Sequence, residues 1–156
     1  MKICVFSDSH GYIDNMIAAI ELERPEMCFF LGDGARDIAR VMERYPELPV
    51  YAVSGNCDFS SGLSSSLCCE VSGATIFATH GHLSDVKYDE RLETLTAQAR
   101  EAGADVALFG HTHRQHLSYN YGVMLLNPGT IGRSYYPGYA LLIIENGNCF
   151  ADLRTI

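Results

Sequence analysis

Two histidines separated by one residue, His111 and His113, follow directly after the apolar segment 106–109. Neutral imidazole is the commonest metal ligand among side chains. On its own such a pair says little, because a surface turn can carry two histidines. The pair gains weight because three of the other four histidines also lie in short segments that follow strand-like runs, namely His10, His80 and His82.

Oxygen-bearing side chains occupy the same kind of position as these histidines. Asp8, Asp33 and Asn56 each come just after an apolar run that is typical of a buried strand. Ligands of open α/β sheets gather at the carboxyl ends of the strands, so several strands can direct these side chains into one crevice. The expected metal ligands are Asp8, His10, Asp33, Asn56, His80, His111 and His113.

This ligand set is too large for one tetrahedral ion, but a shared carboxylate would give two ions a set of protein ligands each. Ion pairs roughly 3.5–4 Å apart stabilise the attacking and the leaving oxygen of a displacement at phosphorus. Mixed nitrogen and oxygen ligands suit transition metals better than calcium or magnesium. We therefore expect two divalent metal ions, manganese first, with iron, nickel, cobalt or zinc as alternatives.

Each of these residues also has a purely structural interpretation. Asp8 or Ser9 could cap a helix that starts near residue 12, and Asp33 could cap the next helix. Asn56 could be a left-handed turn residue, and His80 could be a hydrogen-bonded core histidine. Together these alternatives require a coincidence at every strand end, which favours the metal site.

The elements that must position these residues alternate along the first two thirds of the chain. Apolar residues at helical spacing predict helices over 12–23, around 38–45 and over 92–102. Apolar or alternating runs predict strands at 2–6, 27–31, 49–53, 67–71, 75–79, 105–109, 116–119, 122–126, 139–145 and 149–153. Strands that alternate with helices early and form hairpins late indicate an α/β layered fold in a single domain, 1–156.

Composition narrows the classes of function. The net charge of -8 disfavours bulk nucleic acid as a partner, and no apolar run is long enough to cross a membrane. An acidic chain still suits a small phosphate-ester substrate if cations occupy the site. The six cysteines form no C-x-x-C pair, and Cys4 and Cys28 lie in apolar runs. We therefore expect reduced thiols and a cytoplasmic location.

The order of these motifs resembles that of the calcineurin-like metallophosphoesterases. The matching segments, which span Asp8 to His113, are Asp8-Ser9-His10, Gly32-Asp33, Gly55-Asn56, His80 and Gly110-His111-Thr112-His113. The short length resembles the small bacterial and archaeal phosphodiesterase branch typified by YfcE. The resemblance implies a four-layer α/β/β/α sandwich that hydrolyses phosphate esters through a hydroxide bridging the two metals. It places one metal on Asp8, His10 and His113, the other on Asn56, His80 and His111, and Asp33 between them.

One departure from the family pattern affects catalysis. Where many members have a histidine that protonates the leaving group, this chain has Cys57, in the segment Gly55-Asn56-Cys57-Asp58. A thiol with a pKa of about 8.5 is a poor general acid at neutral pH, so small or activated diesters are the expected substrates. His82 could supply the missing proton or contact phosphate. The expected catalytic residues are therefore Asn56, Cys57, Asp58 and His82.

Two other functions compete with a phosphodiesterase. A catalytically weak protein-binding scaffold, like the retromer subunit Vps29, is favoured by the missing histidine and opposed by the retained ligands. A phosphomonoesterase would want more cationic groups beside the metals, although Arg36 and Arg114 could bind substrate oxygens. The segment containing Tyr135 and Tyr136 could stack on a nucleobase or pack against a second copy in a homo-oligomer.

Overall fold

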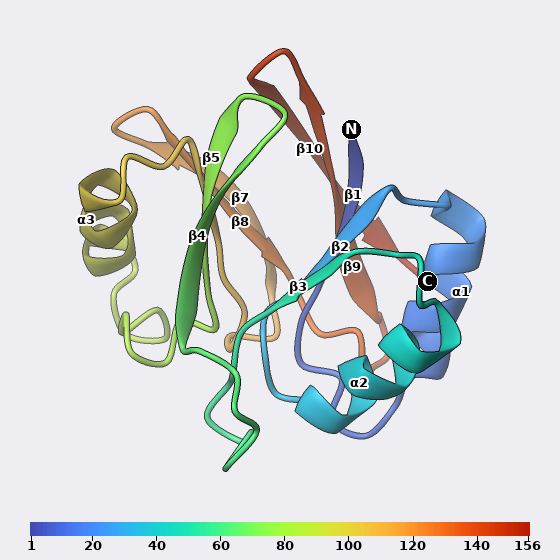
Figure 1. Ribbon diagram of the computed structural model, residues 1–156. Helices are drawn as coiled ribbons and strands as arrows, with labels where there is room; N and C mark the ends of the chain where they lie inside the picture. The colour runs from blue at the N-terminus through green and yellow to red at the C-terminus, as the bar shows by residue number, and fades with distance from the viewer.

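The computed structural model describes residues 1–156 and contains two five-stranded sheets (Figure 1). The first sheet has the order β10-β9-β1-β2-β3, with β1 (Lys2–Phe6), β2 (Met27–Phe30), β3 (Val50–Ala52), β9 (Gly138–Glu145) and β10 (Asn148–Thr155). The second has the order β4-β5-β6-β8-β7, with β4 (Ser66–Val71), β5 (Ala74–Thr79), β6 (Val106–Leu108), β7 (Gln115–Asn120) and β8 (Val123–Pro128).

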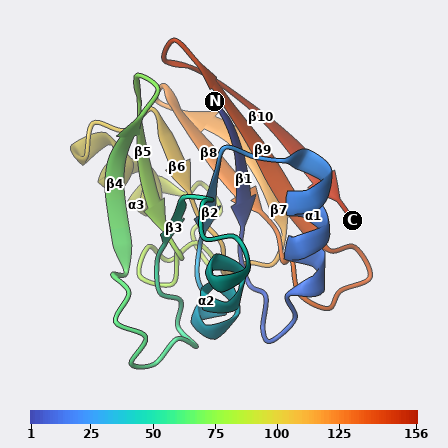
Figure 2. The ribbon, with the colours of Figure 1, turned by 45° about the vertical axis from the view of Figure 1, so that its right-hand side comes forward.

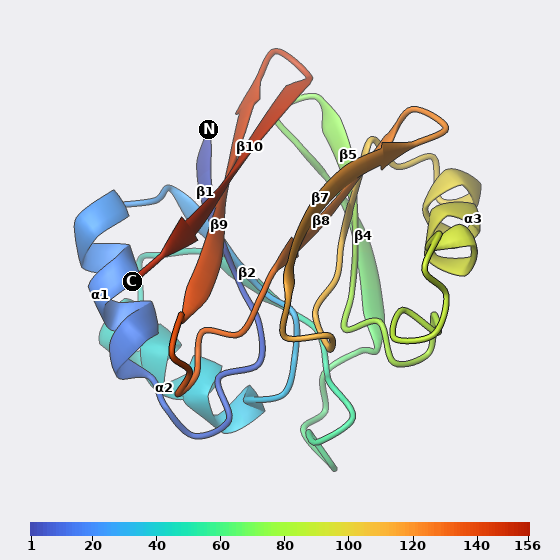
Figure 3. The ribbon, with the colours of Figure 1, turned by 180° about the vertical axis from the view of Figure 1, so that it is seen from behind.

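Helices cover the outer faces of both sheets. α1 (Asp14–Glu23) and α2 (Ala35–Arg44) pack on the first sheet, as Figure 2 shows, and α3 (Glu93–Glu101) packs on the second, on the opposite side of the molecule (Figure 3). Side chains of a strand alternate between its faces, so Ile3 points toward the second sheet while Cys4 points toward the helices. The four-layer α/β/β/α sandwich expected from the sequence is confirmed.

Three hydrophobic clusters fill the spaces between the four layers. The largest lies between the sheets, where residues such as Val5 and Phe29 meet Ile76 and Val106. Tyr139 belongs to the cluster under α1 and is 1 % exposed, whereas Tyr135 is 99 % exposed. The tyrosine-rich segment is thus divided between the core and the surface.

Strand direction brings several loops to one edge of the molecule. β1, β2 and β3 are parallel, and β5 runs parallel to β6. The N-terminus and the β4–β5 turn lie at the top of Figures 1 and 3, and the loops that follow β1, β3 and β5 lie at the bottom. The candidate ligands therefore meet at the lower edge in these views.

None of the three helices is capped by the side chain of the residue directly before it. Ile13 precedes α1 and Gly34 precedes α2, and the N–H of Ala35 at the start of α2 is bound instead by the Asp58 carboxylate. The capping alternatives for Asp8, Ser9 and Asp33 are therefore wrong, and these polar residues have other partners. None of the three helices has the length and apolar character needed to span a bilayer.

Candidate metal centre

Asp8 carries a buried oxygen atom that lacks a hydrogen-bond donor. The residue is 0 % exposed, and its Oδ2 accepts hydrogen bonds from the Ser7 hydroxyl at 2.5 Å and the His111 N–H at 3.1 Å. Its Oδ1 makes no hydrogen bond, although Nε2 of His113 lies 3.1 Å away and Nε2 of His10 lies 3.8 Å away. A buried anionic oxygen requires a compensating partner, and a cation between these atoms would supply it.

His10 and His113 complete a first group around this oxygen. Their Nε2 atoms are 3.2 Å apart, and their side chains are 40 % and 46 % exposed. Metal–nitrogen bonds of about 2.1 Å place two ligands of one ion roughly 3–3.5 Å apart, so this spacing suits a common ion. The donor atoms of Asp8, His10 and His113 all lie within 4.8 Å of one another.

Asp33 lies between this group and a second one. Its Oδ1 accepts a hydrogen bond from the Cys57 N–H at 2.8 Å. Its Oδ2 is 3.9 Å from Nε2 of His10 and 3.5 Å from Nε2 of His80. The backbone holds one oxygen of Asp33, and the other lies between the two groups of candidate ligand atoms.

His80 is held by a hydrogen bond to the backbone. It is 0 % exposed, and its Nδ1 lies 2.7 Å from the carbonyl oxygen of Leu31. A carbonyl can only accept, so Nδ1 carries a proton and Nε2 is the ring nitrogen that faces the other candidate ligands. His80 Nε2 lies 3.1 Å from Asn56 Oδ1 and 3.5 Å from Asp33 Oδ2. These three atoms form a second group of candidate ligand atoms, which a cation would stabilise.

His111 joins the second group through its ring, whose centroid lies 4.9 Å from that of His80. Burial first, then the neighbouring His80 and Lys87, lower the pKa of His111 to about 4. In contrast, the nearby Asp8 carboxylate raises the pKa of His113, against the effect of burial. Burial acts to raise the pKa of Asp8, but His113, His80 and the Ser7 hydroxyl outweigh it and lower this pKa.

The depressed pKa of His111 predicts an acid sensitivity of the protein after metal removal. The unfolded chain binds a proton at this position below pH 6.5, but the folded chain does so only near pH 4. The contribution to stability is therefore present above pH 6.5 and lost as pH falls toward 4. In urea titrations across this window, His111→Gln is expected to flatten the decline of the unfolding free energy. If the unfolding free energy of His111→Gln declined with pH as steeply as that of the wild type, His111 would not be the cause of the acid sensitivity.

The backbone at the centre has a conformation that is rare outside glycine. Five of the candidate ligands have φ between 45° and 66°: Asp8, His10, Asp33, His111 and His113. Aspartate and histidine tolerate this left-handed region better than most residues, and such strain concentrates at functional sites. Asn56 does not have a positive φ, so the left-handed turn considered for it from the sequence is wrong.

Asp58, predicted as a catalytic residue, has a carboxylate that is occupied by the backbone. Its Oδ2 accepts the N–H groups of Asp33 at 2.7 Å and Gly55 at 2.8 Å. Its Oδ1 accepts those of Gly34 at 2.9 Å and Ala35 at 2.8 Å. These bonds fasten the loop after β2 to the loop after β3. In this arrangement Asp58 positions Asp33 instead of facing the ligand atoms.

Cys57 and His82, also predicted as catalytic, both lie at the centre. The donor atoms of His10, Asp33 and Cys57 lie within 4.8 Å of one another, and burial and the nearby Asp33 raise the pKa of the thiol. The His82 ring lies 5.4 Å from that of His80, its Nδ1 is buried without a hydrogen bond, and burial lowers its pKa. At neutral pH these shifts favour a thiol and a neutral imidazole.

Two buried side chains that were not among the predicted site residues hold the loops of the centre. Asp37 Oδ2 accepts the Ser9 hydroxyl at 2.6 Å and the Gly11 N–H at 2.7 Å. Asn127 Nδ2 donates to the Gly110 carbonyl at 2.9 Å and also lies 3.1 Å from the Thr112 hydroxyl. A polar residue inside the fully buried strand β8 was the available signal for Asn127.

Gly110 leaves no room for a side chain beside Asp8. A Cβ there would overlap Ser7 Oγ and lie 2.9 Å from Asp8 Oδ2. We expect Gly110→Ala to lower the unfolding free energy by about 1–3 kcal/mol, because overpacking displaces buried neighbours. Chemical denaturation measures this cost. Gly122→Ala is the control because a Cβ there meets nothing within 4 Å, although its φ of 84° adds backbone strain. A Gly110→Ala protein with the unfolding free energy of the wild type would refute the steric argument.

Comparison with known proteins agrees with this geometry. Residues 1–147 match the family model described as a calcineurin-like phosphoesterase superfamily domain. A relative from Bacillus subtilis (strain 168), named probable metallophosphoesterase YsnB, is 32 % identical over 150 residues, covering 94 % of this chain and 86 % of the relative. The curated relative and the family model thus agree along nearly the whole chain.

Solved structures share the fold. A conserved protein of Streptococcus pneumoniae TIGR4, described as a predicted phosphoesterase, superimposes with a TM-score of 0.82 at 28 % identity, covering 99 % of this chain and 88 % of that one. An archaeal phosphodiesterase superimposes with a TM-score of 0.74 at 23 % sequence identity, covering 99 % of this chain and 100 % of that one. Vps29 from Entamoeba histolytica, crystallised with Zn²⁺, superimposes with a TM-score of 0.79 at 20 % sequence identity, covering 99 % of each chain.

Proposed function

This chain belongs to the calcineurin-like phosphoesterase superfamily, and we propose that it is a metal-dependent phosphodiesterase acting on small or activated diesters. The observation that carries the proposal is the buried Asp8 Oδ1, which has no hydrogen-bond donor and is faced by imidazole nitrogens. A cation is the partner that this oxygen and these lone pairs have in common. The superfamily acts on phosphate esters, so the cation site is proposed as a hydrolytic centre.

We propose two divalent ions, with manganese the expected metal. Asp8, His10 and His113 would hold one, Asn56, His80 and His111 the other, and Asp33 would be shared. When bound, such ions act as Lewis acids toward phosphoryl oxygens and lower the pKa of water. The half-exposed rings of His10 and His113 leave this side of the centre open to a substrate.

The residues beside the ligands favour activated diesters. The raised pKa of Cys57 and the lowered pKa of His82 leave neither group well suited to protonate a leaving group at neutral pH. The net charge of -8 disfavours a monoester dianion more than a diester monoanion. A structural neighbour described as a phosphodiesterase is in keeping with this choice. The six free cysteines accord with the proposed cytoplasmic location.

Hydrolysis of bis-p-nitrophenyl phosphate tests the proposal. We expect turnover that chelation abolishes and added manganese restores, and a slower reaction with p-nitrophenyl phosphate. Faster cleavage of the monoester would make the protein a phosphomonoesterase. No turnover with any first-row divalent metal would rule out the enzyme.

A protein-binding scaffold is the second candidate, because Vps29 shares the fold. That neighbour was crystallised with Zn²⁺, so metal binding alone does not separate a scaffold from an enzyme. The separating measurement is a His111→Ala variant with lost turnover. If this variant keeps every cellular role of the protein, the scaffold is favoured; if the roles are lost with turnover, the enzyme is favoured.

A further inference from the structure

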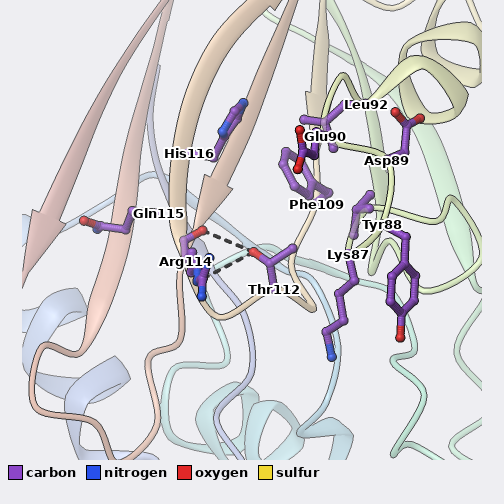
Figure 4. Close-up of a pocket in the computed structure, with 11 residues that line it drawn as sticks. Lys87, Tyr88, Asp89, Glu90, Leu92, Phe109, Thr112, Arg114, Gln115 and His116 are labelled. Carbon is purple, nitrogen blue, oxygen red and sulfur yellow. Dashed lines mark hydrogen bonds between the residues drawn. The ribbon is translucent and has the colours of Figure 1, made fainter.

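A cavity of about 580 Å³ opens beside the metal centre, between the loop that follows β5 and the start of β7 (Figure 4). Thr112, which lies between the candidate ligands His111 and His113, forms part of its wall. The cavity is therefore continuous with the loop that carries two of the ligands. A molecule whose phosphate reached the metal centre could extend into it.

Three buried apolar side chains form part of the inner wall of this cavity. Val86, Leu92 and Phe109 are 6 %, 6 % and 1 % exposed, and they line it. The ring of His116 meets that of Phe109 edge-on at 5.8 Å, and burial lowers its pKa, so it is neutral at pH 7. Its Nε2 lies 2.7 Å from the Ser118 hydroxyl, which fixes the ring. A flat apolar group would find complementary walls here.

The mouth of the cavity carries positive charge on the side of the metal centre. In Figure 4 the Lys87 ammonium group lies on the same side as Thr112 and Arg114, away from the apolar wall. Lys87 and Arg114 therefore line the cavity next to Thr112, in the loop that carries His111 and His113. A phosphate held at the metal centre would find these cations on its side of the cavity.

Two acidic residues, Asp89 and Glu90, also line the cavity, and neither carboxylate lies beside the Lys87 ammonium group in Figure 4. Asp89 accepts backbone N–H groups with both carboxylate oxygens, from Arg91 at 3.2 Å and Thr94 at 3.0 Å, so it serves the start of α3. The Glu90 carboxylate lies on the opposite side of the cavity from the Lys87 ammonium group, on the side of Phe109 (Figure 4). The cavity is thus cationic beside Thr112, and its far side combines apolar side chains with one carboxylate.

We propose that this cavity binds one ester group of the substrate, an aromatic or similarly flat apolar alcohol, while Lys87 contacts the phosphate. The proposal rests on the proposed function for the position of the phosphate. It goes further in assigning the substrate class: a diester with at least one flat apolar arm. Phe109, Leu92 and His116 would contact that arm.

Calorimetric titration of the manganese-loaded protein with phenylphosphonate and methylphosphonate tests the assignment without requiring catalysis. Both compounds carry the same phosphonate group, and neither has an ester bond to cleave. We expect phenylphosphonate to bind at least about tenfold more tightly, because only its ring is buried in the cavity. Equal affinities for the two compounds would overturn the proposal.

Three variants locate the effect. Glu90→Trp places a bulky side chain in the cavity and should abolish the preference for the phenyl compound while leaving methylphosphonate binding unchanged. Glu101→Trp, an exposed position on α3 outside the cavity, is the matched control and should keep the preference. Lys87→Ala should weaken the binding of both compounds by the same severalfold factor. A preference that survives Glu90→Trp would overturn the assignment.

These measurements separate the cavity from the hydrolytic activity. If the phenyl preference is present and Glu90→Trp removes it, but no diester is hydrolysed, the proposed enzyme fails and the binding cavity stands. If diesters are hydrolysed but the two phosphonates bind alike, the enzyme stands and the cavity assignment fails.

Discussion

Asp33→Asn is expected to abolish the metal-dependent hydrolysis of bis-p-nitrophenyl phosphate and to lower the metal content of the purified protein. One oxygen of Asp33 is fixed by the Cys57 N–H, and the other faces histidines of both groups. Asparagine removes the negative charge that two cations would share and can direct an NH₂ group toward them. We expect a loss of roughly 10²–10³-fold or more in kcat, comparable to removing a strong electrostatic contact at a reacting centre.

Measurement of metal content beside the rate keeps this prediction specific. Asp152→Asn is the matched control, because Asp152 is a 59 % exposed aspartate paired with Arg154 far from the ligands in sequence. This control should retain the wild-type rate and metal content. An Asp33→Asn protein that binds two equivalents of manganese and turns over normally would show that Asp33 is not shared by the ions.

Asp58→Ala is expected to damage both stability and activity. The change leaves four N–H groups, those of Asp33, Gly34, Ala35 and Gly55, without their carboxylate acceptor. Hydrogen bonds to a charged group contribute about 1.5–3 kcal/mol each, and partial access to water reduces the total, so we expect a loss of about 3 kcal/mol. For a chain of this size that corresponds to a decrease in Tm of roughly 6–12 °C.

The variants Asp33→Asn and Asp58→Ala should differ in whether stability is lost together with activity. Asp33→Asn should lose activity with little change in Tm, whereas Asp58→Ala should lose both, because it releases the loop that carries Asp33. Thermal unfolding and initial rates on the same preparations give the comparison, with Asp152→Ala as the control for a lost surface carboxylate. An Asp58→Ala protein with the Tm of the wild type would contradict the positioning role.

Much of the fold could be predicted from the sequence because each sheet is built from runs with a clear apolar pattern. Ile3 and Cys4 serve opposite layers, and both sides of β1 are apolar for that reason. Both residues of the turns at Ser72-Gly73 and Asn146-Gly147 have positive φ, and Asn-Gly is a favoured sequence for such a hairpin turn. Polar residues directly after such strands marked the site.

The supporting hydrogen bonds could not be predicted in this way. Asp58 and Asp37 accept backbone N–H groups from loops that are distant in sequence, and a carboxylate in a helix or loop gives no local sign of such partners. The same limit produced the capping hypotheses for Asp8 and Asp33, since a short polar residue before a helix suits a cap equally well. Which donors reach a carboxylate depends on how the layers pack.

The left-handed turns at five candidate ligands have a consequence for ion selectivity. Hydrogen bonds of Asp58 and Asn127 already fasten these loops, so an arriving ion would order little of the chain and would lose little affinity to entropy. A frame of this stiffness adapts poorly to a larger radius or a higher coordination number. Calcium, which takes six to eight oxygens at about 2.3–2.6 Å, should be excluded by geometry even where it is abundant.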